Sequence, residues 1–338
     1  MKPPHCVSGL RQRGAALLLA MTLLALVASL AAGMVWLQWR AVQVEAAERS
    51  RGQSAWILAG ALDWTRLILR EDARSGGVDH AGEPWATPLA EARLSSFLAA
   101  NREATADSEV EAFLAGSITD AQARYNLRNL FADDGRAVPQ ELLTLNRLCA
   151  TAGLREDEAA RIAAGLANSW RARAAAPAPG SASAPGAGNG ASATDESTRV
   201  LPIQRFEHLA WLGLESTVLQ ALRPLVDVLP TRTPVNLNTA SREVLAAVLA
   251  VDAGTAERLV QARQRQAFER LDQAQALLPQ GSTLEGSRVS VGSQYFEVRG
   301  RLRLEDRVLE ETSLVRRRGV AEVLAVQRSR QNLQVNTN

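Results

Sequence analysis

A long uncharged stretch near the amino terminus limits how this chain can fold more than any other feature. From Ala15 to Leu37 the sequence holds 23 residues without a formal charge, most of them Leu and Ala. A helix of that length, rising about 1.5 Å per residue, crosses the hydrocarbon layer of a membrane. Lys2, Arg11 and Arg13 precede the stretch without any carboxylate. This bias predicts a cytoplasmic amino end and an exported body after about residue 40.

Three interpretations of this amino terminus remain open from the residues alone. A secretory signal peptide would be cut at small residues such as Ser29-Leu30-Ala31, and a signal anchor would stay uncut. The third interpretation rests on Arg13-Gly14-Ala15, a short basic leader that ends in glycine at the membrane edge. This leader resembles those of type IV pilins and type II secretion pseudopilins. The resemblance implies cleavage between Gly14 and Ala15 by a prepilin peptidase, followed by N-methylation of Ala15.

The fifth residue after that cleavage point departs from the pilin pattern. Most members of the superfamily carry glutamate there, whereas this chain carries Leu19. A carboxylate inside a membrane is costly unless it has a partner. In the family the glutamate is thought to pair with the terminal amine of the subunit assembled ahead of it. A subunit with nothing ahead of it needs no such group. Leu19 therefore either weakens the resemblance to pilins or narrows it to the protein K family of minor pseudopilins, which typically lacks this glutamate.

Hydrophobic periodicity predicts the elements that follow the membrane segment. A helical period continues from Arg40 to Arg74 and ends at Ser75-Gly76-Gly77. A second helix is expected over Leu89 to Arg102. Strands are expected over Glu109 to Ser117 and over Arg124 to Leu130.

The second half of the chain predicts helices first and strands last. Helices are expected over Leu142 to Ala152 and Asp157 to Arg173, before a segment at 174–198 made almost entirely of Ala, Pro, Gly, Ser, Asn and Thr. Without Val, Leu, Ile or an aromatic residue, that segment is predicted to be a disordered surface loop. A terminal antiparallel sheet is expected from four runs: Arg288 to Val291, Gln294 to Leu304, Arg307 to Arg316 and Val320 to Gln327.

An asparagine motif occurs twice in the exported body. Asn126-Leu127-Arg128-Asn129 precedes one helical stretch, and Asn236-Leu237-Asn238-Thr239 precedes another. This repetition suggests an internal duplication. The sequences that follow the two copies are spaced differently, so the duplication is only a hypothesis.

The second copy opens a segment that resembles a helix-hairpin-helix. Thr239 or Ser241 can cap a first helix, and a turn at residues 251–254 leads to a second helix at Ala256 to Arg263. Such hairpins bind DNA phosphates in uptake and repair proteins. Here Asp252 places a negative charge where the phosphate would lie, and the body after the leader has a net charge of about −1. A protein-interaction fold is therefore favoured, and the alternative kept open is a membrane-anchored DNA-binding protein of a competence or pilus system.

The sequence offers no recognisable catalytic site. Adjacent carboxylates such as Asp133-Asp134 and Glu310-Glu311 do not converge on one side of a helix or strand. Cys6 lies in the leader, so Cys149 alone remains in a processed chain and no internal disulfide can form. The protein is therefore not expected to be an enzyme.

The chain resembles the protein K family of minor pseudopilins in type II secretion. Four features carry the resemblance: the leader, the segment Ile118 to Leu130, the Val235-Asn-Leu-Asn-Thr-Ala240 hairpin and the closing strands. The resemblance implies an α+β fold: a pilin-like long N-terminal helix and an antiparallel sheet, with a large inserted all-α domain of helix-hairpin-helix-like (SAM-like) units. The implied divisions are a leader at 1–14, a stem helix at 15–74 with its membrane part at 15–37, a first pilin-like part at 75–130, the inserted domain at 131–285 and the last strands at 286–330.

The resemblance also implies a place and partners. The family is thought to initiate or cap the periplasmic pseudopilus that exports proteins across the outer membrane. Implied partners are the I-type and J-type minor pseudopilins, the major pseudopilin, the prepilin peptidase and the inner-membrane secretion platform, whereas nucleic acid is not expected. The implied location is the bacterial inner membrane, crossed once, with a periplasmic body. Calcium is the one cofactor implied, by resemblance alone and without named ligands.

Overall fold

The structure is a computed structural model that describes residues 11–94, 112–175, 201–304 and 307–334. The chain divides into two units, residues up to Gly60 and residues from Ala61 onward. In the first unit, helix α1 (Arg11–Ser75) begins, and its apolar side chains from Leu17 to Leu37 are exposed. By length and composition, this helix is able to cross a membrane. The exposed apolar surface covers most of the segment predicted as the membrane part.

The second unit contains a five-stranded antiparallel sheet. Its strands are β1 (Leu89–Arg93), β2 (Ala112–Asp120), β7 (Tyr295–Leu304), β8 (Arg307–Arg318) and β9 (Glu322–Gln334), in the order β1-β2-β7-β8-β9. Side chains along β2 and β7 alternate between buried and more exposed positions over most of their length. This alternation follows from the period of two along a strand, which places one face of the sheet against the core.

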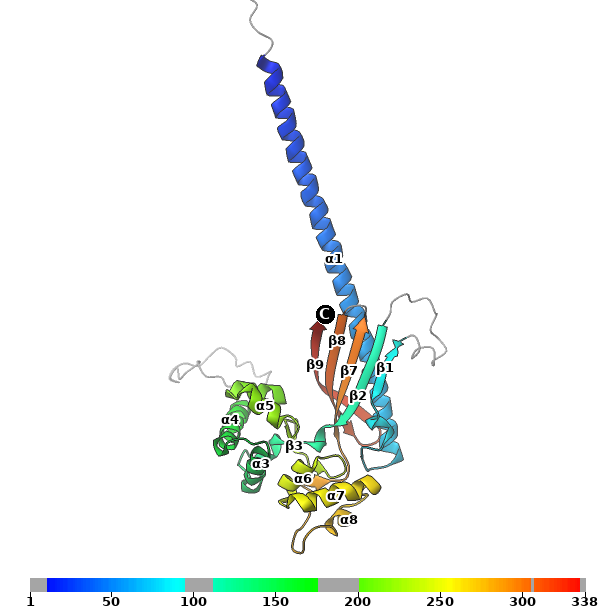
Figure 1. Ribbon diagram of the computed structural model, residues 1–338, viewed down its shortest axis with the longest axis vertical. Coiled ribbons are helices and arrows are strands. Elements are labelled where there is room, and N and C mark those ends of the chain that lie inside the picture. The colour runs from blue at the N-terminus through cyan, green and yellow to red at the C-terminus, as the bar shows by residue number, and fades with distance from the viewer. Residues whose placement is uncertain (1–10, 95–111, 176–200, 305–306, 335–338) are drawn as a thin grey trace, which may run out of the picture. The chain divides into compact units, whose positions relative to one another are not determined.

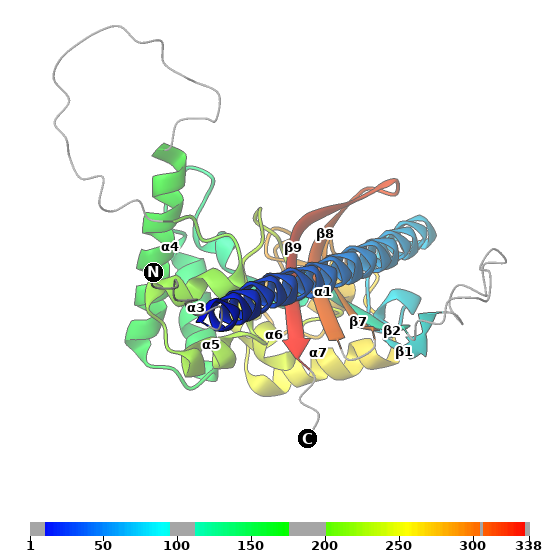
Figure 2. The same ribbon diagram turned by 90° about the horizontal axis from the view of Figure 1, so that it is seen from above.

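The last turns of α1 cover that buried face of the sheet. Leu62 and Leu69 of the helix pack with Phe296, Val298 and Val315 of β7 and β8. The two leucines lie seven positions apart, which places them on the same side of a helix. Figures 1 and 2 show this end of α1 beside the sheet.

Six of the described α-helices are inserted between two strands that are neighbours in the sheet. Strand β2 ends where β7 begins, because Asp120 pairs with Phe296. The chain therefore leaves the sheet after Asp120 and returns to the same place at Tyr295. Between these points lie α3 (Pro139–Thr151), α4 (Glu156–Ala175), α5 (Ser216–Leu222), α6 (Arg242–Leu249), α7 (Ala253–Arg265) and α8 (Leu271–Gln275).

The inserted helices form two groups around one apolar core. Helices α3 to α5 form one group, and α6 to α8 form the other (Figures 1 and 2). Side chains from both groups, including Leu148, Leu166, Leu245 and Leu259, belong to a single buried cluster. The inserted region is therefore one packed body rather than two separate modules.

Two short parallel strand pairs connect this body internally. β3 (Tyr125–Asn126) pairs with β4 (Val226–Asp227), and β5 (Val235–Asn236) pairs with β6 (Val289–Ser290). Each pair contains the first asparagine of one copy of the repeated motif. The two copies thus hold corresponding positions, as expected for an internal duplication.

Three predicted elements differ in the structure. Leu89 to Arg93 forms strand β1 and not a helix, because pairing with β2 overrides the helix propensity of Leu-Ala-Glu-Ala-Arg; residues 95–102 lie outside the described residues. Within the predicted strand Arg124 to Leu130, only Tyr125–Asn126 is extended, and a 3-10 turn follows at Leu127–Leu130. The run at Arg288 to Val291 joins β5 in parallel and not the terminal sheet.

The other predicted helices and strands form close to their expected positions. Helices α3 and α4 match the two expected before the low-complexity segment, and the last three strands match β7, β8 and β9. Residues 174 and 175 continue α4, and the rest of the predicted loop at 174–198 lies outside the described residues. The domain limits at 130, 131, 285, 286 and 330 stay predictions.

Candidate functional site

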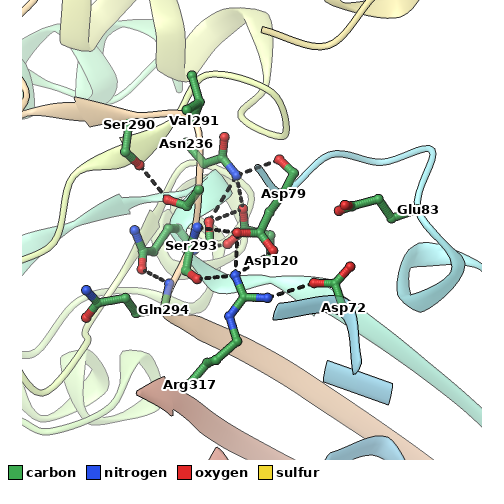
Figure 3. Close-up of polar contacts among 12 residues, drawn as sticks. Asp72, Asp79, Glu83, Asp120, Asn236, Ser290, Val291, Ser293, Gln294 and Arg317 are labelled. Carbon is green, nitrogen blue, oxygen red and sulfur yellow. Dashed lines mark hydrogen bonds and ion pairs between the residues drawn. The ribbon is translucent and has the colours of Figure 1, made fainter. Parts of the chain in front are cut away.

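The point where the inserted domain leaves and rejoins the sheet is built from buried polar side chains. Asp120 and Gln122 lie on the outgoing chain, Ser293 lies on the returning chain, and Asn236 reaches them from β5. All four side chains are buried. We call these four residues the junction; Figure 3 labels Asp120, Asn236 and Ser293 close to one another.

Asn236 joins three segments at the junction. Its side-chain nitrogen donates to the backbone oxygen of Asp79 at 3.0 Å, to Asp120 Oδ2 at 2.9 Å and to Ser293 Oγ at 3.0 Å. Its side-chain oxygen accepts from the backbone nitrogen of Asn238 at 2.9 Å. Because the residue is fully buried, each of these bonds replaces one that water would otherwise make.

Asp120 is the acceptor on which the junction converges. Besides the bond from Asn236, its Oδ2 accepts from Ser293 Oγ at 2.6 Å and from Thr239 Oγ1 at 2.5 Å. Its Oδ1 accepts from the backbone nitrogen of Gln122 at 2.8 Å. Burial raises the pKa of this carboxyl, and the hydrogen bonds from Ser293 and Thr239 oppose that rise. A buried carboxylate is tolerated here because four donors surround it.

Gln122 joins the outgoing and returning chains directly. Its side-chain oxygen accepts from the backbone nitrogens of Gln294 at 2.7 Å and Tyr295 at 3.3 Å, and its nitrogen donates to the backbone oxygen of Pro234 at 2.9 Å. The side chain therefore supplies partners for backbone groups where the regular sheet ladder ends.

An arginine next to the junction holds the inserted domain to the sheet by charge. Arg124 contacts Asp227 of β4 at 2.5 Å and Glu297 of β7 at 2.8 Å, and all three side chains are mostly buried. Removing one member of such a buried group leaves its partners without compensation, which is more costly than losing an exposed pair.

The first copy of the asparagine motif makes similar bonds inside the inserted domain. Asn126 donates to Thr231 O at 2.7 Å and to Thr233 Oγ1 at 3.0 Å, and its oxygen accepts from the backbone of Arg128 and Leu229. Both motifs therefore use an asparagine that bonds the backbone two residues later and also reaches a distant loop.

A group of three carboxylates lies beside the junction. Asp72 is near the end of α1, Asp79 is in the following loop, and Glu83 precedes a short 3-10 turn. One oxygen of each lies within 4.8 Å of the others. We call these three residues the carboxylate cluster. The guanidinium group of Arg317, from β8, contacts Asp72 and Asp79 (Figure 3).

The cluster does not fit a calcium ion held by all three carboxylates. Calcium takes six to eight oxygen ligands, and here the inner oxygens already accept from protein donors. Asp79 Oδ2 accepts from Arg317 and from the backbone nitrogen of Ser293, and Glu83 Oε2 accepts from Trp85 Nε1 at 2.7 Å. An ion among these groups would also lie against the arginine cation. Calcium binding by this chain therefore stays a prediction from resemblance.

Asp72 gives the cluster a measurable pH response. Burial, followed by the nearby Glu83 and Asp79, raises the pKa of its carboxyl to about 6, while Arg317 acts in the opposite direction. Because the folded state holds this proton more tightly than the unfolded state, the contribution of Asp72 to stability falls as the pH rises from about 4 to about 6.

We expect Asp72→Asn to remove that contribution. Urea unfolding at several pH values should show the variant gaining stability relative to the unmodified protein as the pH rises through this window. The matched control is Glu71→Gln, which removes an exposed carboxylate paired with Arg74, and it should follow the unmodified protein. Parallel pH profiles for Asp72→Asn and the unmodified protein would contradict the expectation.

The predicted processing residues belong to the first unit, whereas the junction belongs to the second. Gly14, Ala15 and Leu19 lie along α1 in the first unit, and Leu19 is exposed. Cleavage between Gly14 and Ala15 stays a prediction.

The predicted hairpin forms, and its key residues serve the fold. Asp252 caps α7 by accepting from the backbone nitrogen of Thr255 at 3.0 Å, and Ser241 caps α6. Arg258 donates to Thr255 Oγ1, and Arg263 donates to the backbone oxygen of Leu237. The carboxylate and the arginines that could have contacted DNA phosphates therefore bond within the protein. No contact among the described residues specifically favours the DNA-binding alternative.

Cys149 is buried, and burial raises the pKa of its thiol to about 11. A thiol of that kind is a packing residue and not a nucleophile.

Sequence reasoning identified the motifs of the junction but missed the carboxylate cluster. The segment Ile118 to Leu130 and the Val235 to Ala240 hairpin contain Asp120, Gln122 and Asn236. Asp72, Asp79 and Arg317 carried no local signal, since nothing in the sequence around any of them indicates which distant charge it will meet.

Comparison with known proteins agrees with this architecture. Residues 123–231 and 235–292 match the family described as type II secretion system protein K. A type II secretion system protein K from Pseudomonas aeruginosa is 30% identical over 304 residues, covering 88% of this chain and 86% of the relative. The chain belongs to the type II secretion protein K family. Another protein K, from Pectobacterium carotovorum subsp. carotovorum, is 29% identical over 343 residues, covering 94% and 96%.

The fold is also similar to a chain in the crystal structure of the GspK-GspI-GspJ complex from the enterotoxigenic Escherichia coli type 2 secretion system. The TM-score is 0.61 at 19% sequence identity, and the match covers 84% of this chain and 98% of that chain. Membership of the protein K family makes this chain a minor pseudopilin of type II secretion. The family is a structural class and not a known class of enzyme.

Proposed function

We propose that this minor pseudopilin occupies the tip of the type II secretion pseudopilus, where it initiates or caps filament assembly. The observation that carries the proposal is the insertion of residues 121–294 between neighbouring strands of the sheet. Pilin filaments pack their stem helices side by side, with a sheet on each stem. A subunit whose described residues add helices α3 to α8 to its sheet needs more room than a position along the shaft provides.

The fifth residue after the proposed cleavage point supports the same place. Leu19 offers no carboxylate to the terminal amine of a preceding subunit. The missing group costs nothing at a tip, where there is no preceding subunit, and would leave an amine without a partner along the shaft.

The proposed partners follow from the family and from the related complex. The I-type and J-type minor pseudopilins would lie next to this subunit, because the similar crystal structure is that of a complex of GspK with GspI and GspJ. The major pseudopilin and the inner-membrane platform would follow below. The basic leader favours an amino end in the cytoplasm and a body in the periplasm, and prepilin peptidase would cut between Gly14 and Ala15.

The test is the position of the subunit in assembled pseudopili. An epitope tag after Asn338, detected by gold-labelled antibody on sheared filaments, should mark one end only. A tagged major pseudopilin in the same preparation is the control and should be labelled along the whole filament. Label on this subunit at regular intervals along the shaft would contradict a tip position.

A further inference from the structure

The environment of Arg317 resembles that of a bound cation more than that of an ordinary ion pair. Its Nη1 donates to Asp72 Oδ2 at 2.7 Å. Its Nη2 donates to Asp79 Oδ1 at 2.7 Å, to Asp79 Oδ2 at 2.5 Å and to the backbone oxygen of Ser293 at 2.9 Å. The guanidinium carbon also lies 4.9 Å from the ring centre of Phe296. Four oxygen atoms from three segments thus surround one positive group.

These charges have been removed from water. The side chains of Arg317, Asp72 and Asp79 are only 9%, 8% and 1% exposed. Ionised carboxylates buried at this spacing repel one another, and above the pKa of Asp72 a positive charge among them is needed to offset that repulsion. In proteins this charge comes either from a metal ion or from a cationic side chain.

Whether a metal ion or a side chain supplies the positive charge matters for stability, because the cluster lies where three parts of the fold meet. Asp72 lies in the last turn of the stem helix, Asp79 accepts from the backbone nitrogen of Ser293 on the returning chain, and Arg317 lies near the end of β8. The backbone passes closely here, since a Cβ added at Gly292 would lie 2.6 Å from the backbone oxygen of Gly77. The cluster therefore holds together the stem end, the sheet and the inserted domain.

We propose that Arg317 is the permanent cation of the carboxylate cluster and takes the place that a calcium ion would otherwise fill. An ion dissociates, and the stability that it adds depends on its concentration relative to its dissociation constant. A guanidinium group is part of the chain, is charged at every physiological pH, and presents its donors in a fixed plane. The fold at this point is therefore independent of calcium in the medium.

Removing the guanidinium would convert the cluster into a metal site. In Arg317→Met, the aliphatic length remains while Asp72, Asp79 and Glu83 face one another without a cation. Such oxygen-rich groups attract divalent ions, calcium above all. The variant should be less stable in the absence of calcium, and calcium should restore part of the loss.

The test is the thermal unfolding of the full-length protein in detergent, in EGTA and in increasing calcium. The Tm of the unmodified protein should change by less than about 1 °C across the series. Arg317→Met should unfold at least about 5 °C lower in EGTA and recover at least about 3 °C at millimolar calcium. Arg318→Met, which removes an exposed arginine next in sequence, is the control and should behave as the unmodified protein.

Two results would overturn the proposal. One is a saturable rise in the Tm of the unmodified protein with calcium that Asp79→Asn abolishes. The other is a folded Arg317→Met that shows no response to calcium. Arg317→Lys is the second variant should Arg317→Met fail to fold, and it should be destabilised yet remain insensitive to calcium, because it keeps the charge. A calcium response in Arg317→Lys equal to several degrees would also count against the proposal.

Terbium, a luminescent substitute for calcium, gives an independent measurement. Trp85 bonds Glu83, so a terbium ion in the cluster would be excited through that indole. Arg317→Met should show tryptophan-sensitised terbium emission, and the unmodified protein should not. Equal emission from both proteins that Asp79→Asn removes would contradict the proposed role of Arg317.

Discussion

Replacing Asn236 with alanine is expected to lower the free energy of unfolding of the body by about 3 kcal/mol. The substitution removes two N–H donors that are shared among three acceptors, and one acceptor, from a side chain that is fully buried. The most costly consequence is at Asp120, whose buried carboxylate loses a donor. An unsatisfied buried group costs about 1–3 kcal/mol, and charged groups cost more.

The measurement is urea unfolding followed by tryptophan fluorescence, with Asn168→Ala as the matched control. Asn168 is an exposed asparagine on α4, so its replacement should change stability by no more than about 0.5 kcal/mol. If Asn236→Ala were as stable as Asn168→Ala, the junction would contribute little to holding the domains together. Under the proposed tip position, secretion should fall along with stability, because the inserted domain would no longer be held firmly to its sheet.

Replacing Gly14 with leucine is expected to abolish processing of the amino terminus. This prediction rests on the proposed prepilin-type leader, in which glycine precedes the bond that is cut. A glycine exposes its backbone without a side chain, and a branched side chain at this position would obstruct a peptidase that binds the chain closely. The uncut precursor should accumulate in the membrane and secretion should stop.

Mass spectrometry of the extracted protein reads the result directly. The unmodified protein should begin at N-methylated Ala15, and Gly14→Leu should begin at Met1. Gly33→Leu is the control because it places the same side chain in the same apolar helix, where no other atom lies within 4 Å of the added Cβ. A normally cut Gly14→Leu would remove the pilin interpretation, and a start at Ala32 would favour a secretory signal peptide.

Patterns local in the chain predicted much of the fold. The apolar run and the helical period after it predicted α1, because both depend only on residues within a few turns of one another. Strands β7, β8 and β9 were predicted from the alternation of side chains, which reflects the period of a strand. The capping residues Ser241 and Thr239 were offered as alternatives, and the structure assigns the cap of α6 to Ser241.

Long-range pairing decided the elements that local patterns got wrong. Leu89 to Arg93 consists of residues that favour helices, yet it lies at the edge of the sheet and pairs with β2. Arg288 to Val291 has the composition of a sheet strand, yet it pairs with β5 inside the inserted domain. In both cases the partner strand lies far enough along the chain that no local window contains it.

The sequence by itself determined that this protein has a membrane-length apolar helix, motifs of the protein K family and a helical insertion before its last strands. Only the tertiary structure decided how the charges are arranged. Arg317 meets Asp79 across 238 positions and Asp72 across 245, and Asn236 meets Asp120 across 116. The physical reason is that a charge or an amide has no preferred partner along the chain. Its partner is determined by the packing of the sheet, the stem and the inserted domain, which brings particular buried polar groups together.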